Sequence, residues 1–138
     1  MTAGLVDTNV LVSFFLNRNA EQQRLAFSLF EAANAGTVTL LIPQVALTDM
    51  VFVLTGLYER DPREAREMLH DLLSHPGVAP VDQLSWPRLM ELWPKELPDF
   101  ADAVLATIAE ELAVPAVATF DKPLIRKLKK LGLRGYWS

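Results

Sequence analysis

Short apolar strands alternate with helical segments along this chain, and that alternation limits its fold more than any other feature. Strands made of consecutive apolar and β-branched residues suit a sheet that is covered on both faces. Between them, apolar residues recur at near-helical spacing, with Gly or Pro at several segment ends. The pattern predicts an α/β fold with three layers, in which helices flank a central, mostly parallel, five-stranded sheet.

The expected elements have the following boundaries. Strands are predicted over residues 3–6, 37–42, 78–81, 114–118 and 133–137. Helices are predicted over residues 10–15, 21–35, 44–58, 62–74, 85–92 and 100–113, with a basic helix from residue 123.

The length of 138 residues predicts a single domain over residues 1–138, and an apolar fraction of 51% is ample for its core. No apolar run approaches the roughly 18 residues that a membrane span needs, and no basic region precedes the first apolar stretch. The absence of cysteine excludes disulfides, thiolate zinc sites and a cysteine nucleophile. We therefore expect a cytoplasmic protein that does not contact membranes.

The net charge of −4 does not by itself indicate a nucleic-acid-binding protein. Six of the thirteen basic residues nevertheless fall in the last seventeen positions. Such a run is usually a solvated helix face, and the alternative is a local patch that binds phosphate groups. The run consists of Lys122, Arg126, Lys127, Lys129, Lys130 and Arg134.

Four aspartates stand where a charged side chain needs an explanation. Asp7 and Asp121 each follow a predicted strand, where open α/β sheets bind their ligands. Asp49 and Asp102 lie in apolar helices, and carboxylates are rarely buried unless they are paired or bound to a metal. Clustered carboxylates repel one another unless a cation joins them, and oxygen-only clusters suit Mg²⁺ or Mn²⁺.

Helix capping offers a different interpretation of the same acids. Asp7 stands where it can cap the first helix, and Asp99 where it can cap the helix that begins at residue 100. Asp102 would then be favourable in the first helical turn through the helix dipole alone. These alternatives stay open on the residues themselves.

Three blocks of the sequence together resemble the hallmark motifs of PIN domains. They are Val-Asp-Thr-Asn-Val-Leu at residues 6–11, Asp-Phe-Ala-Asp-Ala-Val-Leu-Ala at 99–106 and Val-Ala-Thr-Phe-Asp at 117–121. Each block alone is a weak signal, but their order and spacing fit a compact PIN domain. The closest resemblance is to the VapC ribonuclease toxins of toxin–antitoxin pairs.

The resemblance implies an acidic pocket that binds Mg²⁺ or Mn²⁺ and cuts RNA with a metal-activated water. Asp7 and Asp102 match the main metal ligands, and Asp49 and Asp121 complete the catalytic acids. The residues expected to support the pocket, mainly by hydrogen bonds to these carboxylates, are Thr8, Asn9, Asp99 and Thr119.

Asp49 departs from the family pattern, which has Glu at this position. The stretch Ile-Pro-Gln-Val-Ala-Leu-Thr-Asp at residues 42–49 reproduces the pattern with an acid that is one methylene shorter. Because Mg²⁺ demands strict coordination, the shorter side chain is expected to bind through water or not at all. The departure supports an alternative function, a non-catalytic PIN-fold module that binds protein or nucleic acid.

The expected partners follow from the resemblance. They are an RNA substrate, a VapB-like antitoxin that covers the acidic cleft, and a second copy of the chain in a homodimer. Apolar residues in 25–30 and 51–57 are available for such surfaces, although a core would use them equally well. The tryptophans could stack on bases, but packing is the expected role. The residues expected to hold the RNA backbone are Lys122, Arg126, Lys127 and Lys130.

Overall fold

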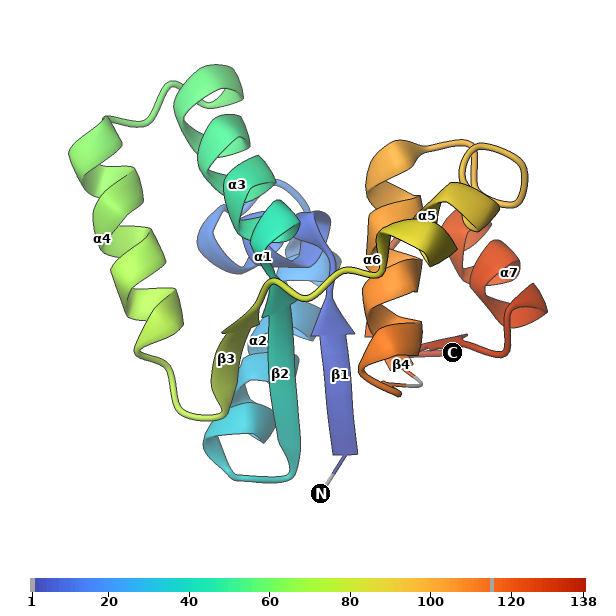
Figure 1. Ribbon diagram of the computed structural model, residues 1–138. Coiled ribbons are helices and arrows are strands. Elements are labelled where there is room, and N and C mark those ends of the chain that lie inside the picture. Colours follow the sequence, from blue (N-terminus) through green and yellow to red (C-terminus); the bar gives the residue numbers. More distant parts are fainter. Residues whose placement is uncertain (1, 115) are drawn as a thin grey trace.

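The computed structural model describes residues 2–114 and 116–138. Its sheet has five strands in the order β3-β2-β1-β4-β5, and every neighbouring pair is parallel (Figure 1). The predicted α/β architecture is confirmed, with a sheet that is parallel throughout rather than mostly so. The strands are β1 (Thr2–Val6), β2 (Val38–Pro43), β3 (Val78–Val81), β4 (Ala116–Ala118) and β5 (Arg134–Gly135).

The last two strands are shorter than the sequence predicts. The strand expected over 133–137 is reduced to β5, because the chain turns after it and the Ser138 N–H donates to the Gly135 carbonyl at 3.2 Å. The strand expected over 114–118 includes Pro115, which lies outside the described residues. Val114 is not part of a strand, and β4 begins at Ala116.

Helices connect the strands, and most of them begin at a polar residue whose side chain accepts a hydrogen bond from the first turn. Asp7, Asn19, Asp61, Asp99 and Asp121 each form such a cap, which supplies a partner for a backbone N–H that lacks one within the helix. The helices are α1 (Thr8–Phe15), α2 (Ala20–Asn34), α3 (Gln44–Phe52), α4 (Pro62–Leu73), α5 (Trp86–Leu92), α6 (Phe100–Glu111) and α7 (Lys122–Lys130).

The single helix expected over residues 44–58 changes its winding part-way. After α3 the chain continues as a π-helical turn, η1 (Val53–Leu57), in which the Tyr58 N–H donates to the Val53 carbonyl at 3.1 Å. This bond spans five residues instead of four, as in the π-bulges that interrupt α-helices. Apolar spacing does not distinguish the two windings over one turn.

Two apolar cores lie on opposite faces of the sheet. Successive residues of a strand point to opposite faces, so Val6 belongs to the core under α1–α4 while Leu5 belongs to the core under α5–α7. In β4, Ala118 and Val117 divide in the same way. Burial on both faces explains why these strands are apolar throughout.

The connections create a crevice at one edge of the sheet. From β1 the chain builds outward through β2 to β3, and then returns to place β4 on the other side of β1. The strand order thus reverses between β1 and β4, and ligands of open α/β sheets bind beyond the carboxyl ends of the strands at such a point. In Figure 1 this point lies between the helices α3 and α4 on one side and α5, α6 and α7 on the other. Within the described residues, no helix is long and apolar enough to span a membrane.

Candidate active site

Asp7 stands at the reversal point, directly after β1. Its N–H donates to the Ala118 carbonyl at 2.9 Å, which ties the end of β1 to the end of β4. One carboxylate oxygen, Oδ1, accepts the Thr8 N–H at 2.8 Å and caps α1. Its pKa is raised from the ordinary value, chiefly because burial penalises the charged form. Capping therefore accounts for only one oxygen of Asp7.

Thr119 links Asp7 to Asp121, the acid that follows the neighbouring strand β4. This buried residue follows β4, and its hydroxyl donates to Oδ2 of Asp7 at 2.8 Å. The same hydroxyl accepts the N–H of Asp121 at 3.1 Å. Asp121 in turn caps α7 by accepting the Leu124 N–H at 3.1 Å. These bonds fix the orientation of both carboxylates relative to the sheet.

Helix α6 contributes two further carboxylates. Asp99 caps the helix by accepting the Asp102 N–H at 2.9 Å, as the capping interpretation predicts. Asp102, in the first turn, has a pKa raised to about 7 by its own burial and then by the charges of Asp99, Asp7 and Asp121. A carboxyl group that titrates near neutral pH in a crevice is a candidate functional group.

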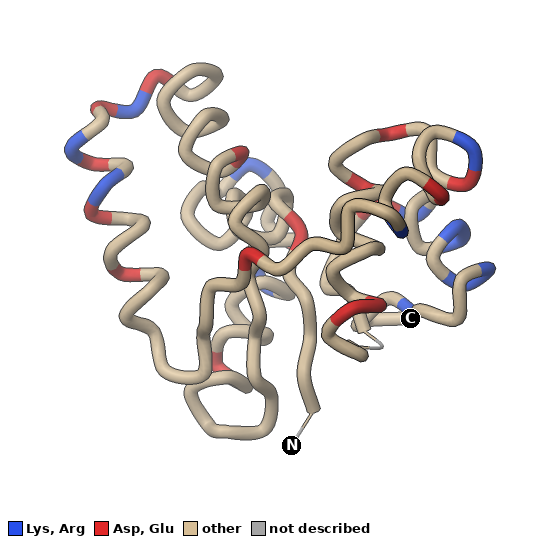
Figure 2. The backbone as a smooth tube through the Cα atoms, viewed as in Figure 1, with Lys and Arg blue, Asp and Glu red and all other residues tan. Residues whose placement is uncertain are grey.

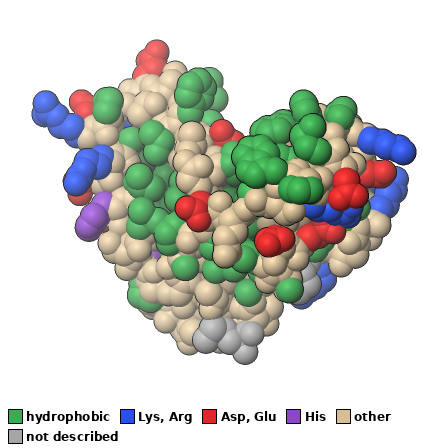
Figure 3. Space-filling model, viewed as in Figure 1, with side chains coloured by type: hydrophobic (Ala, Val, Ile, Leu, Met, Phe, Trp, Pro, Cys, Tyr) green, Lys and Arg blue, Asp and Glu red, His purple; other side chains and the backbone are tan. Residues whose placement is uncertain are grey.

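Asp49 approaches from the opposite wall, on α3. Burial raises its pKa, and the charge of Asp99 on α6 raises it further. Asp49 and Asp121 also raise the pKa of Asp7. The mutual repulsion shows that acids far apart in the sequence lie within electrostatic range of one another. The space-filling view has a notch between two lobes, with acidic side chains inside it (Figure 3).

The chemistry of these side chains fits a hard divalent cation. All of them present carboxylate oxygens, and a cation would relieve both their desolvation and their repulsion. They do not form a closed cage, however: no group of three or more Asp, Glu, His or Cys among the described residues is positioned to hold a metal ion. Mg²⁺ characteristically keeps several waters and binds through one or two carboxylates, so an open arrangement is compatible with it.

Two of the expected supporting residues differ from the prediction. Thr8 contacts Asp7 through its backbone N–H, and within residues 2–114 and 116–138 its hydroxyl donates to no carboxylate. The exposed side chain of Asn9 points elsewhere, because its Oδ1 accepts from the Arg18 guanidinium at 3.4 Å and its carbonyl accepts from the same group at 3.0 Å. Arg18 also donates to buried Ser13 at 3.3 Å. The sequence gives no signal for this contact, which crosses the turn after α1.

The basic residues of α7 have different surroundings. Lys127 is half-buried and lowers the pKa of Asp102, so it acts on the acidic pocket itself. Lys122 and Arg126 line a separate groove of about 540 Å³, which reaches Thr119. Lys130 is exposed and does not line this groove. In Figure 2 several of the blue Lys and Arg positions gather along α7.

Comparison with known families decides the classification. A PIN-domain family model matches residues 4–123. The chain belongs to the PIN-domain family. The match spans all five carboxylates of the pocket, from Asp7 to Asp121. No curated protein matches the chain. PIN domains are typically metal-dependent nucleases that bind nucleic acid, so membership of this family indicates a nuclease-type function.

Proposed function

We propose that this PIN domain is a metal-dependent endoribonuclease that hydrolyses RNA phosphodiester bonds. The observation that carries the proposal is the gathering of Asp7, Asp49, Asp102 and Asp121 at the reversal point of the sheet. A fold has no structural need for several partly buried carboxylates that raise one another's pKa. The desolvation and mutual repulsion of these carboxylates are explained if they bind a cation and take part in a reaction.

Each residue has a distinct role in this proposal. Asp7 and Asp102 would be the main residues that hold Mg²⁺ or Mn²⁺, and Asp49 and Asp121 would complete the acidic pocket. Thr119 is a positioning residue, because its hydroxyl orients Asp7 through one bond and the Asp121 backbone through another. When bound, the ion supplies a water of lowered pKa and stabilises charge on the phosphate oxygens.

The biological role that we propose is the toxin of a VapBC-type pair. The support is the resemblance of the three sequence blocks to VapC toxins. A VapB-like antitoxin would cover the acidic notch, and the chain would form a homodimer. Exposed apolar side chains on α3 and η1 are available for such contacts: Phe52 is 76% exposed and Leu57 is 72% exposed.

A non-catalytic PIN-fold binding module is the second candidate. Two observations favour it: Asp49 stands where the family pattern typically has Glu, and the carboxylates of the described residues form no closed metal site. Such a module would bind nucleic acid or protein through the same notch. It would not need a metal for binding and would not cut the RNA.

Cleavage of a mixed RNA substrate separates the two candidates. The purified protein is incubated with the RNA in Mn²⁺, in EDTA, and in EDTA followed by excess Mn²⁺. The nuclease is expected to cut in Mn²⁺, stop in EDTA and recover, while Asp7→Asn stays inactive. A folded protein that leaves many RNAs intact in Mn²⁺ and Mg²⁺ would favour the binding module. Cutting that persists in Asp7→Asn would reveal a contaminating nuclease or a wrong site.

A further inference from the structure

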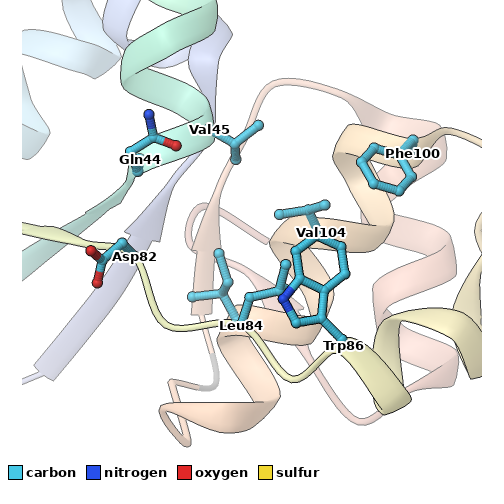
Figure 4. A pocket seen from close by; sticks show the side chains of 8 residues that line it. Gln44, Val45, Asp82, Leu84, Trp86, Phe100 and Val104 are labelled. Atoms are coloured by element: carbon cyan, nitrogen blue, oxygen red, sulfur yellow. The ribbon is translucent and has the colours of Figure 1, made fainter.

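A pocket of about 330 Å³ opens between the start of α3 and α6 (Figure 4). One wall comes from the start of α3, with Gln44 and Val45, and the other comes from α6, with Phe100 and Val104. Trp86, at the start of α5, closes the pocket beside Val104. Its size and its mostly apolar lining with few polar groups are typical of sites that bind small organic groups.

The pocket lies next to the candidate active site along two helices. Val45 and Asp49 are four residues apart on α3, so they lie one above the other on the same helix face. On α6, Phe100 follows Asp99, whose charge acts on both Asp49 and Asp102. One extended ligand could therefore reach both the pocket and the carboxylates.

Trp86 is the side chain of this pocket whose exposure the packing of the fold does not explain. The residue is 61% exposed, although tryptophan usually contributes to cores. The other two tryptophans pack against aromatic rings, Trp93 against Phe100 and Trp137 against Phe120. Within residues 2–114 and 116–138, Trp86 contacts no other ring and its indole N–H donates no hydrogen bond. Among the described residues, it is an aromatic surface without a ring or hydrogen-bond partner.

The charges of the lining indicate what kind of group fits there. No lysine or arginine lines the pocket, and its one ionisable residue is Asp82, so a phosphate would be repelled. Gln44 donates its Nε2 to the Thr48 hydroxyl at 2.8 Å, which leaves its Oε1 to accept a hydrogen bond. Aromatic and apolar walls with an amide acceptor suit a neutral, flat, hydrogen-bonding ring.

We propose that this pocket binds one unstacked nucleobase of single-stranded RNA, next to the phosphate at the carboxylates. The base stacks on Trp86 and meets Gln44 at its edge. The proposal rests on the proposed ribonuclease function, because that function supplies the RNA. It predicts that the enzyme prefers single-stranded RNA, since a base inside a duplex cannot reach the pocket.

Equilibrium binding tests the pocket separately from catalysis. Fluorescence anisotropy measures the affinity for a labelled single-stranded RNA and for a ribose-phosphate chain of equal length without bases. All proteins carry Asp102→Asn and are studied in Mg²⁺, so that the RNA stays intact. The variants are Trp86→Leu, Trp86→Phe and Met90→Ala. Met90 is the matched control, because it lies on the same helix, is 63% exposed and does not line the pocket.

Trp86→Leu is expected to weaken RNA binding about tenfold, since base stacking on an aromatic ring contributes roughly 1–3 kcal/mol. Trp86→Phe should retain most of the affinity, Met90→Ala all of it, and the chain without bases should bind every variant equally. Unchanged RNA affinity in Trp86→Leu would overturn the proposal and leave the pocket to a protein partner. An equal loss with the chain without bases would also overturn it. If base-dependent binding is found but the unmutated protein never cuts RNA, the pocket stands and the proposed nuclease fails.

Discussion

At the scale of single residues, the candidate site destabilises the metal-free fold, because its carboxylates are partly buried and repel one another. The pKa of Asp102 is raised to about 7, so the folded protein holds this proton more tightly than the unfolded chain, whose carboxyls titrate near 3.8. Raising the pH from 3.8 through 7 therefore destabilises the metal-free fold at this position. Well above pH 7, Asp102 is ionised in the folded protein and its full destabilising effect is present.

Removing that charge should stabilise the metal-free protein. Asp102→Asn is expected to raise the free energy of unfolding by about 1 kcal/mol at pH 8, after allowance for solvent screening of this half-buried group. The gain should be smaller at pH 5, where the folded wild-type protein is mostly protonated at Asp102. Urea unfolding in EDTA at both pH values measures it. A gain that is equal at the two values would contradict the assigned repulsion.

The hydroxyl of Thr119 should matter more than its size. Thr119→Val removes the bond to Asp7 and leaves the Asp121 N–H without its partner, so the affinity for Mn²⁺ should fall about tenfold. Thr119→Ser keeps the hydroxyl and should bind Mn²⁺ nearly as well as the wild type. Isothermal titration calorimetry measures both affinities. Equal affinity in Thr119→Val and Thr119→Ser would show that the hydroxyl does not position Asp7.

The sequence predicted the acids of the pocket better than the contacts around them. An acid directly after a buried strand, or inside an apolar helix, is visible in the sequence because burial makes it costly, as at Asp7 and Asp49. The partner of Asn9 and the exposure of Trp86 depend on how separate segments pack. Capping and pocket roles also coincide in Asp99, which caps α6 and still acts electrostatically on its neighbours.

At the scale of elements, one glycine controls how α2 and the β2–β3 pair meet. Gly77 has a φ of +77°, and a Cβ there would lie 2.6 Å from the Ala33 carbonyl oxygen of α2. Its own carbonyl accepts the Leu40 N–H of β2 at 2.7 Å, so the backbone cannot shift freely. The position therefore excludes a side chain for two independent reasons.

A pair of matched glycine variants separates these reasons. Gly36 also has a positive φ, +80°, but nothing lies within 4 Å of its Cβ position. Gly36→Ala should cost about 1 kcal/mol from backbone strain alone, whereas Gly77→Ala should cost about 3 kcal/mol because the clash adds to it. Urea unfolding gives both values. Equal costs would mean that α2 yields to the new side chain.

Element types were more predictable than element ends. Apolar runs and helical spacing identified the strands and helices, because burial on both faces of the sheet leaves a strong pattern. The short β5 and the π-helical turn η1 were not predicted, since each depends on one or two backbone bonds rather than on side-chain pattern. The parallel order of the sheet follows from the connections between strands.

At the scale of the whole molecule, the proposed function requires an acidic protein to hold a polyanion. Lys122 and Arg126 lie one turn apart on α7 and line the groove that reaches Thr119, so they are the cations best placed to bind the RNA backbone. Lys127 faces the carboxylates instead. Helix α7 thus presents cations both to the groove and to the carboxylates.

Neutralising these two cations should weaken binding in a salt-dependent way. Lys122→Gln with Arg126→Gln is expected to lower the slope of log affinity against log salt by about 1.4, or about 0.7 per lost phosphate contact on single-stranded RNA. The control, Arg63→Gln with Arg66→Gln, changes the charge equally on α4, where both residues are exposed. The same slope in both double variants would show that the salt dependence of RNA binding reflects only the net charge of the protein, not a contact at α7.

The central claim is that carboxylates from separate elements form one divalent-cation site, and Mn²⁺ binding tests it most directly. Titration calorimetry would compare the wild-type protein with single Asp→Asn variants at positions 7, 49, 102 and 121. Asp82→Asn is the control, because Asp82 is exposed and has no part in the mutual repulsion that raises the pKa of Asp7 and Asp102. We expect binding to the wild type and the control, a loss of at least tenfold at positions 7 and 102, and smaller losses at 49 and 121. Folded wild-type protein that binds no Mn²⁺, or variants at 7 and 102 that bind it as tightly as the control, would contradict the account.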